Sequence, residues 1–553
     1  MALNDVRFNR NQTGLGQALP GKDHISGFVF YSNTYPSGFN VNNKIKKILS
    51  LTDAENLGID SDYSDETKAG SGNVSITLKG AAGDVDSVFF AGVLLGQVTV
   101  PATPYADATA EAVAIRAAIN ANTQYHGFTS AGSTGNVTVV PPTGYGKAAN
   151  GSNITFTSVA AIGGAGTATA TVTQLSAGVG SLFLSLHNKI SEYYRIQPQG
   201  VAYVGVFPVP ATFDGSELTT LQNYAAGEIR EALVVLNAAA AGTAFASSQV
   251  TALQTICTAL QTAHKPLSVV FEADFTGATI SALSDLSTLT AKNVSVAIHC
   301  EGDYNEAAYS RTAGYSVGDK VTWGNGCYQC LTSCLGIDPW NTVYWARRQD
   351  NLKAIVGWSC AGSGNLLGAI SLSKVNECVA WVQKYNIVTG LGFDNVGFVT
   401  GDLLRNQTDA LLSTLNDQHY IFLRKITGLT GSYFNDSWTA ITSTNDYCYI
   451  EKNRTMDKCE RNVRAAVIPL LASPLYVNAD GTLSQATIAV FENAANQPVE
   501  QMEIDGELSN HKVTIDPTQN VITSSKLVMS LVDIPVGVAR NIEINTGFTT
   551  KIS

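Results

Sequence analysis

A serine between two glycines is the first residue with the surroundings of a catalytic nucleophile. The stretch 361–364, Ala-Gly-Ser-Gly, is similar to the sharp turn that presents a serine in some hydrolases. That turn needs a glycine two residues before the serine, and Ala361 stands there. Ser363 therefore lacks the pattern that a nucleophile of this kind requires.

Other candidate groups also lack the partners that a reaction needs. The seven histidines are scattered and form no His-x-x-x-His pair. Asp394 and Asp402 fall in loop-like stretches without a phosphate-binding glycine pattern, and the glycines around Ser363 lack the third glycine of a dinucleotide site. We therefore predict no catalytic residue and no cofactor.

Three closely spaced cysteines allow more than one interpretation. Cys327, Cys330 and Cys334 have spacing that suits a metal ion, but the next cysteine is Cys360 and a fourth ligand is not obvious. Alternatively, Cys330 packs inside a small module, while the other two are free or paired across a hairpin. We predict no metal site, and the sequence leaves free, disulfide-bonded and metal-bound states open.

Aromatic residues gather in the same segment and also have two interpretations. Large rings can form the core of a small module, which needs bulky apolar side chains. Rings exposed on a rigid β scaffold can instead stack on sugar rings. The candidates for glycan stacking are Trp323, Trp340, Tyr344 and Trp345.

Composition limits the kind of protein that these residues belong to. The chain has 553 residues, of which 45% are hydrophobic and 14% charged, so it can bury a large core. The formal net charge of -11 argues against nucleic acid as a main partner. No run of about 20 strongly apolar residues predicts a membrane span, and the amino terminus lacks the apolar region of a secretory signal, so we expect synthesis in the cytoplasm.

Strands and helices alternate over most of the chain, which predicts βαβ units and a mainly parallel sheet. The expected strands are Gly27–Tyr31, Gly200–Phe207, Leu267–Ala273 and Val294–Ile298, and the expected helices lie within 41–51, 218–236, 250–263 and 372–385. Two β-rich segments interrupt this pattern, at 75–176, with one helix from Ala108 to Ala121, and at 303–345. We expect them to form separate outward domains.

The carboxyl terminus alternates apolar and polar residues. Five apolar residues lie at even positions, namely Val536, Val538, Ile542, Ile544 and Phe548, with Arg540 interrupting the series. This pattern predicts a terminal strand that has no sheet of its own. Such a strand is expected to pair with a sheet edge of another copy, and the amino-terminal arm, 1–24, is a further candidate strand.

Two resemblances add to this interpretation. The order Tyr309, Tyr315, Gly318-Asp319, Tyr328 and Tyr344-Trp345 resembles carbohydrate-binding modules of the chitin-binding type. That resemblance implies a ligand face at Tyr344 and Trp345, with Trp323 or Trp340, and a host surface glycan as a partner.

The larger resemblance is to tail sheath proteins of contractile bacteriophages and related injection machines. It rests on several sequence blocks: Asn4-Asp5-Val6, Gly14-Leu15-Gly16, Gly27–Tyr31, Gly431–Asp436 and Arg461–Ala466. It implies an α/β core and a C-terminal α+β domain, two β-rich inserted domains and strand-forming terminal arms.

The predicted division follows from that plan. It gives an arm at 1–24, a core at 25–74, 177–302 and 346–428, insertions at 75–176 and 303–345, and a C-terminal domain at 429–553 ending in an arm at 535–553. The implied function is a non-enzymatic, structural subunit of a virion tail, assembled in the host cytoplasm. It would polymerise helically around a tail tube protein, contact baseplate and tail terminator proteins, and contract to drive the tube through the host envelope. The alternative is a virion-surface adhesin or decoration protein that binds host glycans.

Overall fold

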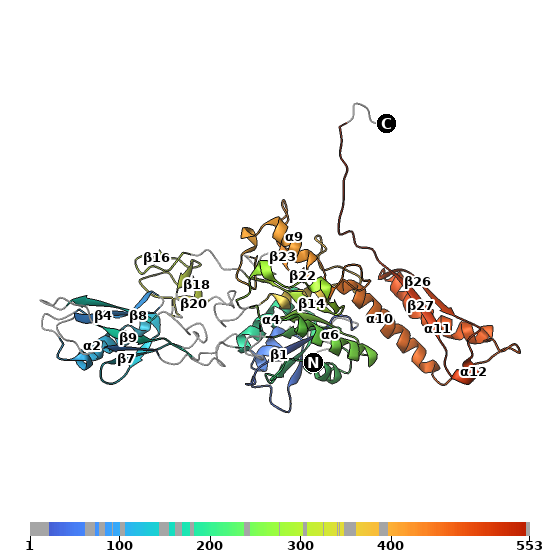
Figure 1. The fold of residues 1–553 in the computed structure, drawn as a ribbon, viewed down its shortest axis with the longest axis horizontal. Helices are drawn as coiled ribbons and strands as arrows, with labels where there is room; N and C mark the ends of the chain where they lie inside the picture. The colour runs from blue at the N-terminus through green and yellow to red at the C-terminus, as the bar shows by residue number, and fades with distance from the viewer. Residues whose placement is uncertain are drawn as a thin grey trace, which may run out of the picture.

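The computed structural model describes most of the chain in several stretches. These are residues 22–60, 72–76, 83–90, 92–99, 105–142, 154–160, 169–176, 182–236, 244–275, 277–301, 307–323, 326–339, 341, 343–347, 361–385 and 396–548. Figure 1 shows three bodies in a row, with a β-rich body at one end, an α/β body in the middle and the α10–β27 region at the other end. The predicted arm at 1–24 lies outside the described residues except for its last three.

The α/β body is built on a mainly parallel sheet of seven strands. Their order is β2 (Ile45–Ile48), β10 (Val201–Phe207), β1 (Ile25–Tyr31), β11 (Glu231–Val235), β12 (Ser268–Glu272), β14 (Val294–Ala297) and β22 (Tyr420–Ile421). Only the edge strand β2 runs antiparallel to its neighbour. Every residue of β1, β10, β11 and β12 is buried, as expected for a parallel sheet that is covered on both faces.

Helices from distant parts of the chain cover this sheet. Helix α8 (Ser363–Leu372) packs on β11 and β12 and also against α4 (Leu182–Ile196). Helices α5 (Glu217–Tyr224) and α6 (Ser247–Thr262) pack along β10 to β14. The predicted mixed α/β core is thus present, and the helix expected within 250–263 is confirmed as α6.

Two expected helices differ from the structure, and a third is present but fills only part of its segment. Segment 41–51 contains strand β2, and helix α1 (Leu51–Asn56) begins where the expected helix ends. Segment 218–236 contains α5 but also the central strand β11. Residues 373–385 form turns after the end of α8.

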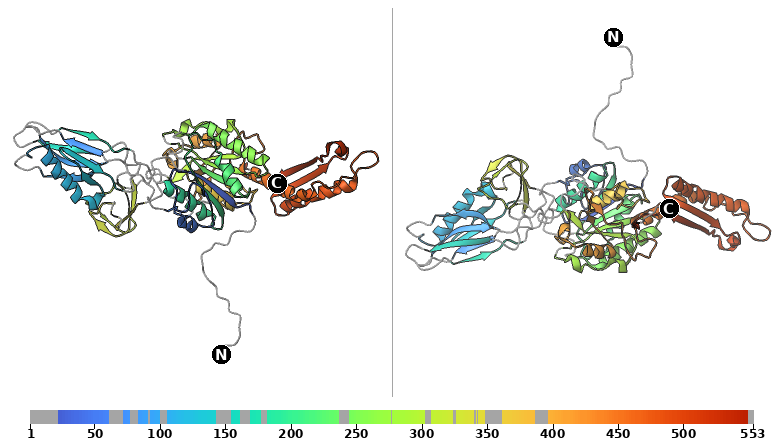
Figure 2. Two further views of the ribbon diagram at one scale, coloured as in Figure 1. Left: turned by 90° about the horizontal axis from the view of Figure 1, so that it is seen from below. Right: turned by 90° about the horizontal axis from the view of Figure 1, so that it is seen from above.

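The two insertions form one body rather than two separate domains. The larger one holds the sheets β6-β7-β3-β9 and β5-β4-β8 together with α2 (Ala108–Ala121), the helix expected there, and α3 (Thr123–His126). The smaller one holds the sheets β17-β18-β20 and β16-β19. Their buried residues form a single hydrophobic cluster, and Arg311 of one stacks over Tyr125 of the other. The two modules lie side by side in both views of Figure 2.

The strands of this outer body also correct the expected boundaries. They are β3 (Gly72–Ile76), β4 (Gly83–Phe90), β5 (Val93–Gln97), β6 (Thr129–Ala131), β7 (Asn136–Val140), β8 (Ile154–Ala160), β9 (Ala170–Thr173), β16 (Gly314–Tyr315), β17 (Lys320–Trp323), β18 (Gly326–Cys330), β19 (Cys334–Leu335) and β20 (Trp345–Arg347). Strand β3 crosses the expected boundary at 74, and β20 crosses the one at 345.

Residues 429–450 belong to the middle body, although the sequence placed them in the C-terminal domain. Strand β24 (Tyr433–Phe434) pairs with β23 (Leu423–Arg424), and β25 (Ala440–Ile441) pairs with β13 (Thr290–Ala291). The smaller elements nearby are β15 (His299–Glu301), β21 (Val396–Phe398) and α9 (Asp409–Asp417). Phe434 and Trp438 lie in the same hydrophobic core as the central sheet.

The C-terminal body consists of two long helices and a hairpin. Helix α10 (Ile450–Val467) leaves the middle body and is followed by a short 3-10 turn and by α11 (Gln485–Ile504). The antiparallel strands β26 (Leu508–Ile515) and β27 (Met529–Pro535), joined through α12 (Val521–Ser524), pack along α11. None of the helices in the described part of the chain combines the length and apolar character needed to span a bilayer.

Candidate assembly interface

The hairpin of β26 and β27 offers open strand edges. Its ladder contains only these two strands, so no further strand in the described ranges pairs with either outer edge. Val513 and Ile515 are buried on the inner side, whereas Val532 and Ile534 point outward and are exposed. A two-stranded sheet is marginal on its own, and the packing against α11 supports this one.

The chain after β27 is an exposed arm. Residues 536–548 form no strand, and Figure 1 shows the arm running away from the bodies. Ile542 and Ile544 are each 78% exposed, and Phe548 is fully exposed. Val536 is half-buried and Val538 is 37% exposed. Of the residues predicted for a terminal strand, Ile542, Ile544 and Phe548 are therefore solvent-exposed within the single chain, whereas Val536 is partly buried.

Arg540 fixes the root of this arm to the middle body. Its Nε donates to both carboxylate oxygens of Asp436 at 2.9 Å, and its Nη2 donates to Glu451 Oε1. The guanidinium also lies 3.4 Å from the ring centroid of Tyr449. Burial alone would lower the pKa of Arg540, but the carboxylates of Asp436 and Glu451 raise it above its ordinary value.

The sequence did not identify this anchor. Arg540 is the only charged residue at the even positions of this segment, which is the one local signal that it has a separate role. Its partners lie 104 and 89 residues earlier in the chain, and no spacing rule connects residues that far apart. We name the contacts of Arg540 with Asp436, Glu451 and Tyr449 the arm clasp.

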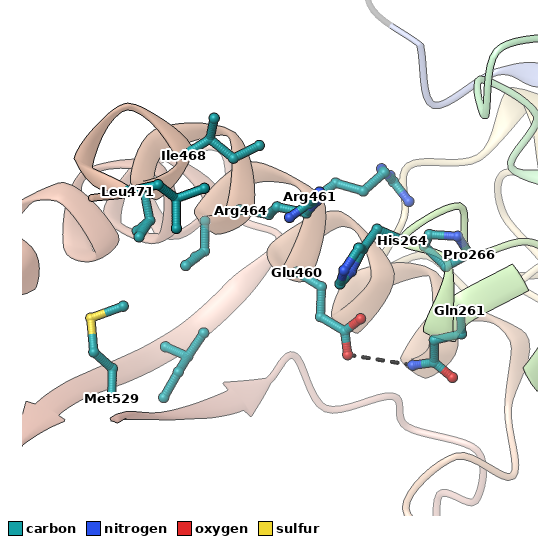
Figure 3. Close-up of a pocket in the computed structure, with 12 residues that line it drawn as sticks. Gln261, His264, Pro266, Glu460, Arg461, Arg464, Ile468, Leu471 and Met529 are labelled. Carbon is teal, nitrogen blue, oxygen red and sulfur yellow. Dashed lines mark hydrogen bonds between the residues drawn. The ribbon is translucent and has the colours of Figure 1, made fainter. Parts of the chain in front are cut away.

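A groove of about 430 Å³ lies beside the hairpin (Figure 3). Val467, Ile468 and Leu471 line it from the end of α10 and the turn that follows, and Met529 and Leu531 line it from β27. Gln261 at the end of α6 donates to Glu460 across it. The groove thus joins the outer side of α10 to the inner face of the hairpin.

The aromatic residues predicted to stack on glycans are divided by the structure. Trp323 is 6% exposed and Trp345 is 1% exposed, and the Trp345 indole donates to the carbonyl of Ile337 at 2.9 Å. Buried rings present no face to a sugar, so both residues belong to the core. Tyr344 is half-buried, and Trp340 lies outside the described residues.

The cysteines and the candidate catalytic groups form no reactive site among the residues that the structure describes. Cys330 and Cys334 carry free thiols, and burial raises the pKa of Cys334 to about 11, while the side chain of Cys327 lies outside the described part. Within the described ranges, no three His, Cys, Asp or Glu side chains are placed to hold a metal ion.

Ser363 lies in the interior of the α/β body. Its hydroxyl donates to Glu272, which also accepts from the main-chain N–H of Ala361 at 3.0 Å and lies 3.0 Å from Lys189 Nζ. The side chains of Ser363, Glu272 and Lys189 are all buried. Burial lowers the pKa of the nearby His299 to about 4. This network joins α4, β12 and α8. The other candidate, Asp394, lies outside the described residues.

Comparisons with known proteins point to the same part of the chain. Residues 446–553 match the family model described as DUF2586, C-terminal domain. The match therefore covers α10, α11, the hairpin and the arm. No curated protein is significantly similar in sequence.

Several solved structures of contractile systems are similar to the chain. The anti-feeding prophage helical sheath in contracted state is 12% identical, with a TM-score of 0.44 over 100% of both chains. The PVC sheath complex in contracted state is 15% identical, with a TM-score of 0.38 over 67% of this chain and 80% of that chain. The sheath tail protein from Desulfitobacterium hafniense is 11% identical, with a TM-score of 0.32 over 96% and 100%.

Proposed function

We propose that this chain is a structural subunit that polymerises helically around a tail tube and contracts to drive the tube through a host envelope. The assignment to a tail sheath rests on the sequence blocks that resemble such proteins. The way in which copies join is supported by one observation. An exposed apolar arm and a hairpin with open edges occur in the same chain.

Strand exchange satisfies both features at once. In this proposal, residues 541–548 of one copy add to an edge of the hairpin β26–β27 in another copy. Each ladder hydrogen bond contributes about 0.5–1.5 kcal/mol net. Burial of Ile542, Ile544 and Phe548 contributes roughly 1.5–3 kcal/mol each, and ordering the backbone costs about 1–2 kcal/mol per residue. The net free energy of each exchanged strand is modest, and many such strands together hold a lattice.

The clasp favours exchange between copies over pairing within one chain. The arm follows β27 directly, and only four residues lie between Pro535 and Arg540. Arg540 is held at the middle body by Asp436 and Glu451. An arm held there leads away from its own hairpin, so its free part is available to a neighbour.

The further partners follow from the same proposal. The sheath would surround a tail tube protein and end at baseplate and tail terminator proteins, in a virion tail assembled in the host cytoplasm. The amino-terminal arm, 1–24, is proposed as a second exchanged strand, since it has no core-forming periodicity.

A pair of substitutions tests the proposal. Ile542→Asp with Ile544→Asp places charges on the exchanged strand, and we expect folded chains that form no helical polymers by negative-stain microscopy and sedimentation. Val343→Asp is the matched control, since Val343 is 70% exposed on the outer body, and it should polymerise normally. Normal polymers from the double variant would show that packing of the bodies, rather than strand exchange, carries the assembly.

A further inference from the structure

Four charged residues form one stripe along α10. Glu451, Arg454, Lys458 and Arg461 follow one another at spacings of three and four residues, which places them on the same face of a helix. The stripe begins with an anion in the first turn and continues with three cations. This order agrees with the helix dipole, which favours negative charge at the amino-terminal end.

The anionic end of the stripe holds the carboxyl-terminal arm. Glu451 accepts from Arg540 Nη2, and Asp436 beside it accepts two hydrogen bonds from Arg540 Nε. Both carboxylates are buried, with side chains 5% and 10% exposed. Each needs the arginine, because an unpaired buried charge is strongly unfavourable.

The cationic end of the stripe holds the chain where the amino-terminal arm begins. Lys458 Nζ lies 2.8 Å from Asp23 Oδ2, and Arg461 Nη2 lies 3.1 Å from Asp23 Oδ1. Arg454 donates to the main-chain carbonyl of Asp23 at 3.4 Å. Burial alone would raise the pKa of Asp23, but the hydrogen bond from Lys458 and the three cations hold it below its ordinary value.

The same stripe also reaches the hairpin. Lys458 Nζ lies 2.7 Å from Glu507 Oε1, and Glu507 directly precedes β26. One helix face therefore contacts the roots of both arms and the start of the proposed acceptor sheet. The root of the carboxyl-terminal arm carries the positive charge of Arg540, and the root of the amino-terminal arm carries the negative charge of Asp23. Neither root can therefore occupy the other's position on α10.

We infer that the α10 stripe positions both arms, and that Arg540 and Asp23 are the residues at which each arm becomes fixed. The position at which the arm is fixed sets the length of free chain that can reach a neighbouring copy. This consequence rests on the proposed function. The free part of the carboxyl-terminal arm starts at Asn541. Arg540 is a positioning residue, and the apolar residues after it make the link.

Cleavage by trypsin tests the clasp on unassembled protein. Trypsin must bind the arginine side chain, so a clasped Arg540 protects the bond between Arg540 and Asn541. In the Asp436→Asn, Glu451→Gln variant, we expect cleavage at this bond to be at least about tenfold faster. Glu451→Gln alone should give an intermediate rate and serves if the double variant is unstable.

Two controls make the result specific. Glu460→Gln changes an exposed carboxylate on α10 away from the stripe and should leave the rate unchanged. Lys526 is exposed before β27. The rate of cleavage after Lys526 should be the same in all variants, because it depends on the structure of the hairpin and not on the clasp. Equal cleavage after Arg540 in wild type and both clasp variants would overturn the clasp.

Polymers of the same variants test the consequence. With the clasp removed, we expect fewer polymers and loss of a uniform helical rise by cryo-electron microscopy, whereas Glu460→Gln should match wild type. Uniform polymers from a variant whose Arg540 is readily cleaved would overturn the positioning role. Failure of wild type to polymerise would contradict the proposed function and leave the cleavage result standing.

Discussion

Two truncations that differ by five residues separate the clasp from the exchanged strand. One ends the chain at Pro535 and removes the whole arm, including Arg540. The other ends it at Arg540 and removes only residues 541–553. Both delete Ile542, Ile544 and Phe548, so both remove the proposed link between copies.

The expected stabilities differ because only the longer deletion leaves buried charges unpaired. Asp436 and Glu451 keep their places in the middle body but lose Arg540, whose side chain is only 22% exposed. Breaking a buried ion pair from one side costs about 3–5 kcal/mol. The shorter deletion removes exposed residues, for which changes stay within about 0.5 kcal/mol.

Urea unfolding followed by tryptophan fluorescence measures this difference. Trp438 is a suitable reporter, because its ring lies 4.6 Å from that of Tyr449 beneath Arg540. We expect the chain ending at Pro535 to unfold at clearly lower urea, and the chain ending at Arg540 to match wild type. Neither should polymerise. Equal midpoints for the two truncations would refute the energetic role of the clasp, and normal polymers from the chain ending at Arg540 would refute strand exchange.

Three further predictions concern pH, the outer body and the insertions. Burial raises the pKa of Glu231 to about 8 from 4.5, so the folded state keeps a proton that the unfolded state loses, and the free energy of unfolding should fall as pH rises from about 4.5 to 8. Urea midpoints across that range should show a smaller fall in Glu231→Gln, and an unchanged slope would contradict the argument. Trp345→Ala should destabilise the outer body by about 3–5 kcal/mol, measured by thermal unfolding, while Val343→Ala should change it by less than about 0.5 kcal/mol; similar losses would show that Trp345 is not a core residue. Because the insertions share one core, removing 72–176 or 307–347 alone should destabilise the insertion that remains. Removing both, with short Gly/Ser bridges in their place, should leave polymers intact by negative-stain microscopy. Loss of assembly in the double deletion would show that the outer body takes part in polymerisation.

The buried strands were predictable because the central sheet is parallel. Both of its faces are covered, so each strand reads as a continuous apolar run, as in Val201–Phe207. Burial on both faces of the sheet also explains why the segment of β2 was predicted to be a helix. Ile45 and Ile48 lie on opposite faces of a strand and are both buried, and their spacing of three imitates a helix.

Burial of single rings was not predictable. The spacing of Trp323 and Trp345 is the same whether the rings face a ligand or the core. Their position depends on β17, β18 and β20 packing against the larger insertion, which begins more than 200 residues earlier. The merging of the two insertions is a contact between distant segments, and periodicity does not report such contacts.

The assembly features were predictable only in part. The alternation from Val536 to Phe548 is a local pattern, and the structure leaves the last three of these apolar residues exposed. The clasp and the α10 stripe depend on Asp23, Asp436 and Arg540 meeting one helix. Asp436 and Arg540 are 104 positions apart, and Asp23 lies far earlier in the chain, so only the fold brings them together.

Cryo-electron microscopy of the polymer formed by the purified full chain tests the central claim most directly. We predict density in which residues 541–548 of one copy continue the ladder of β26 and β27 in another copy, with Arg540 still on Asp436 and Glu451 of its own chain. A polymer whose copies touch only through their bodies, or in which each arm pairs with its own hairpin, would contradict the account.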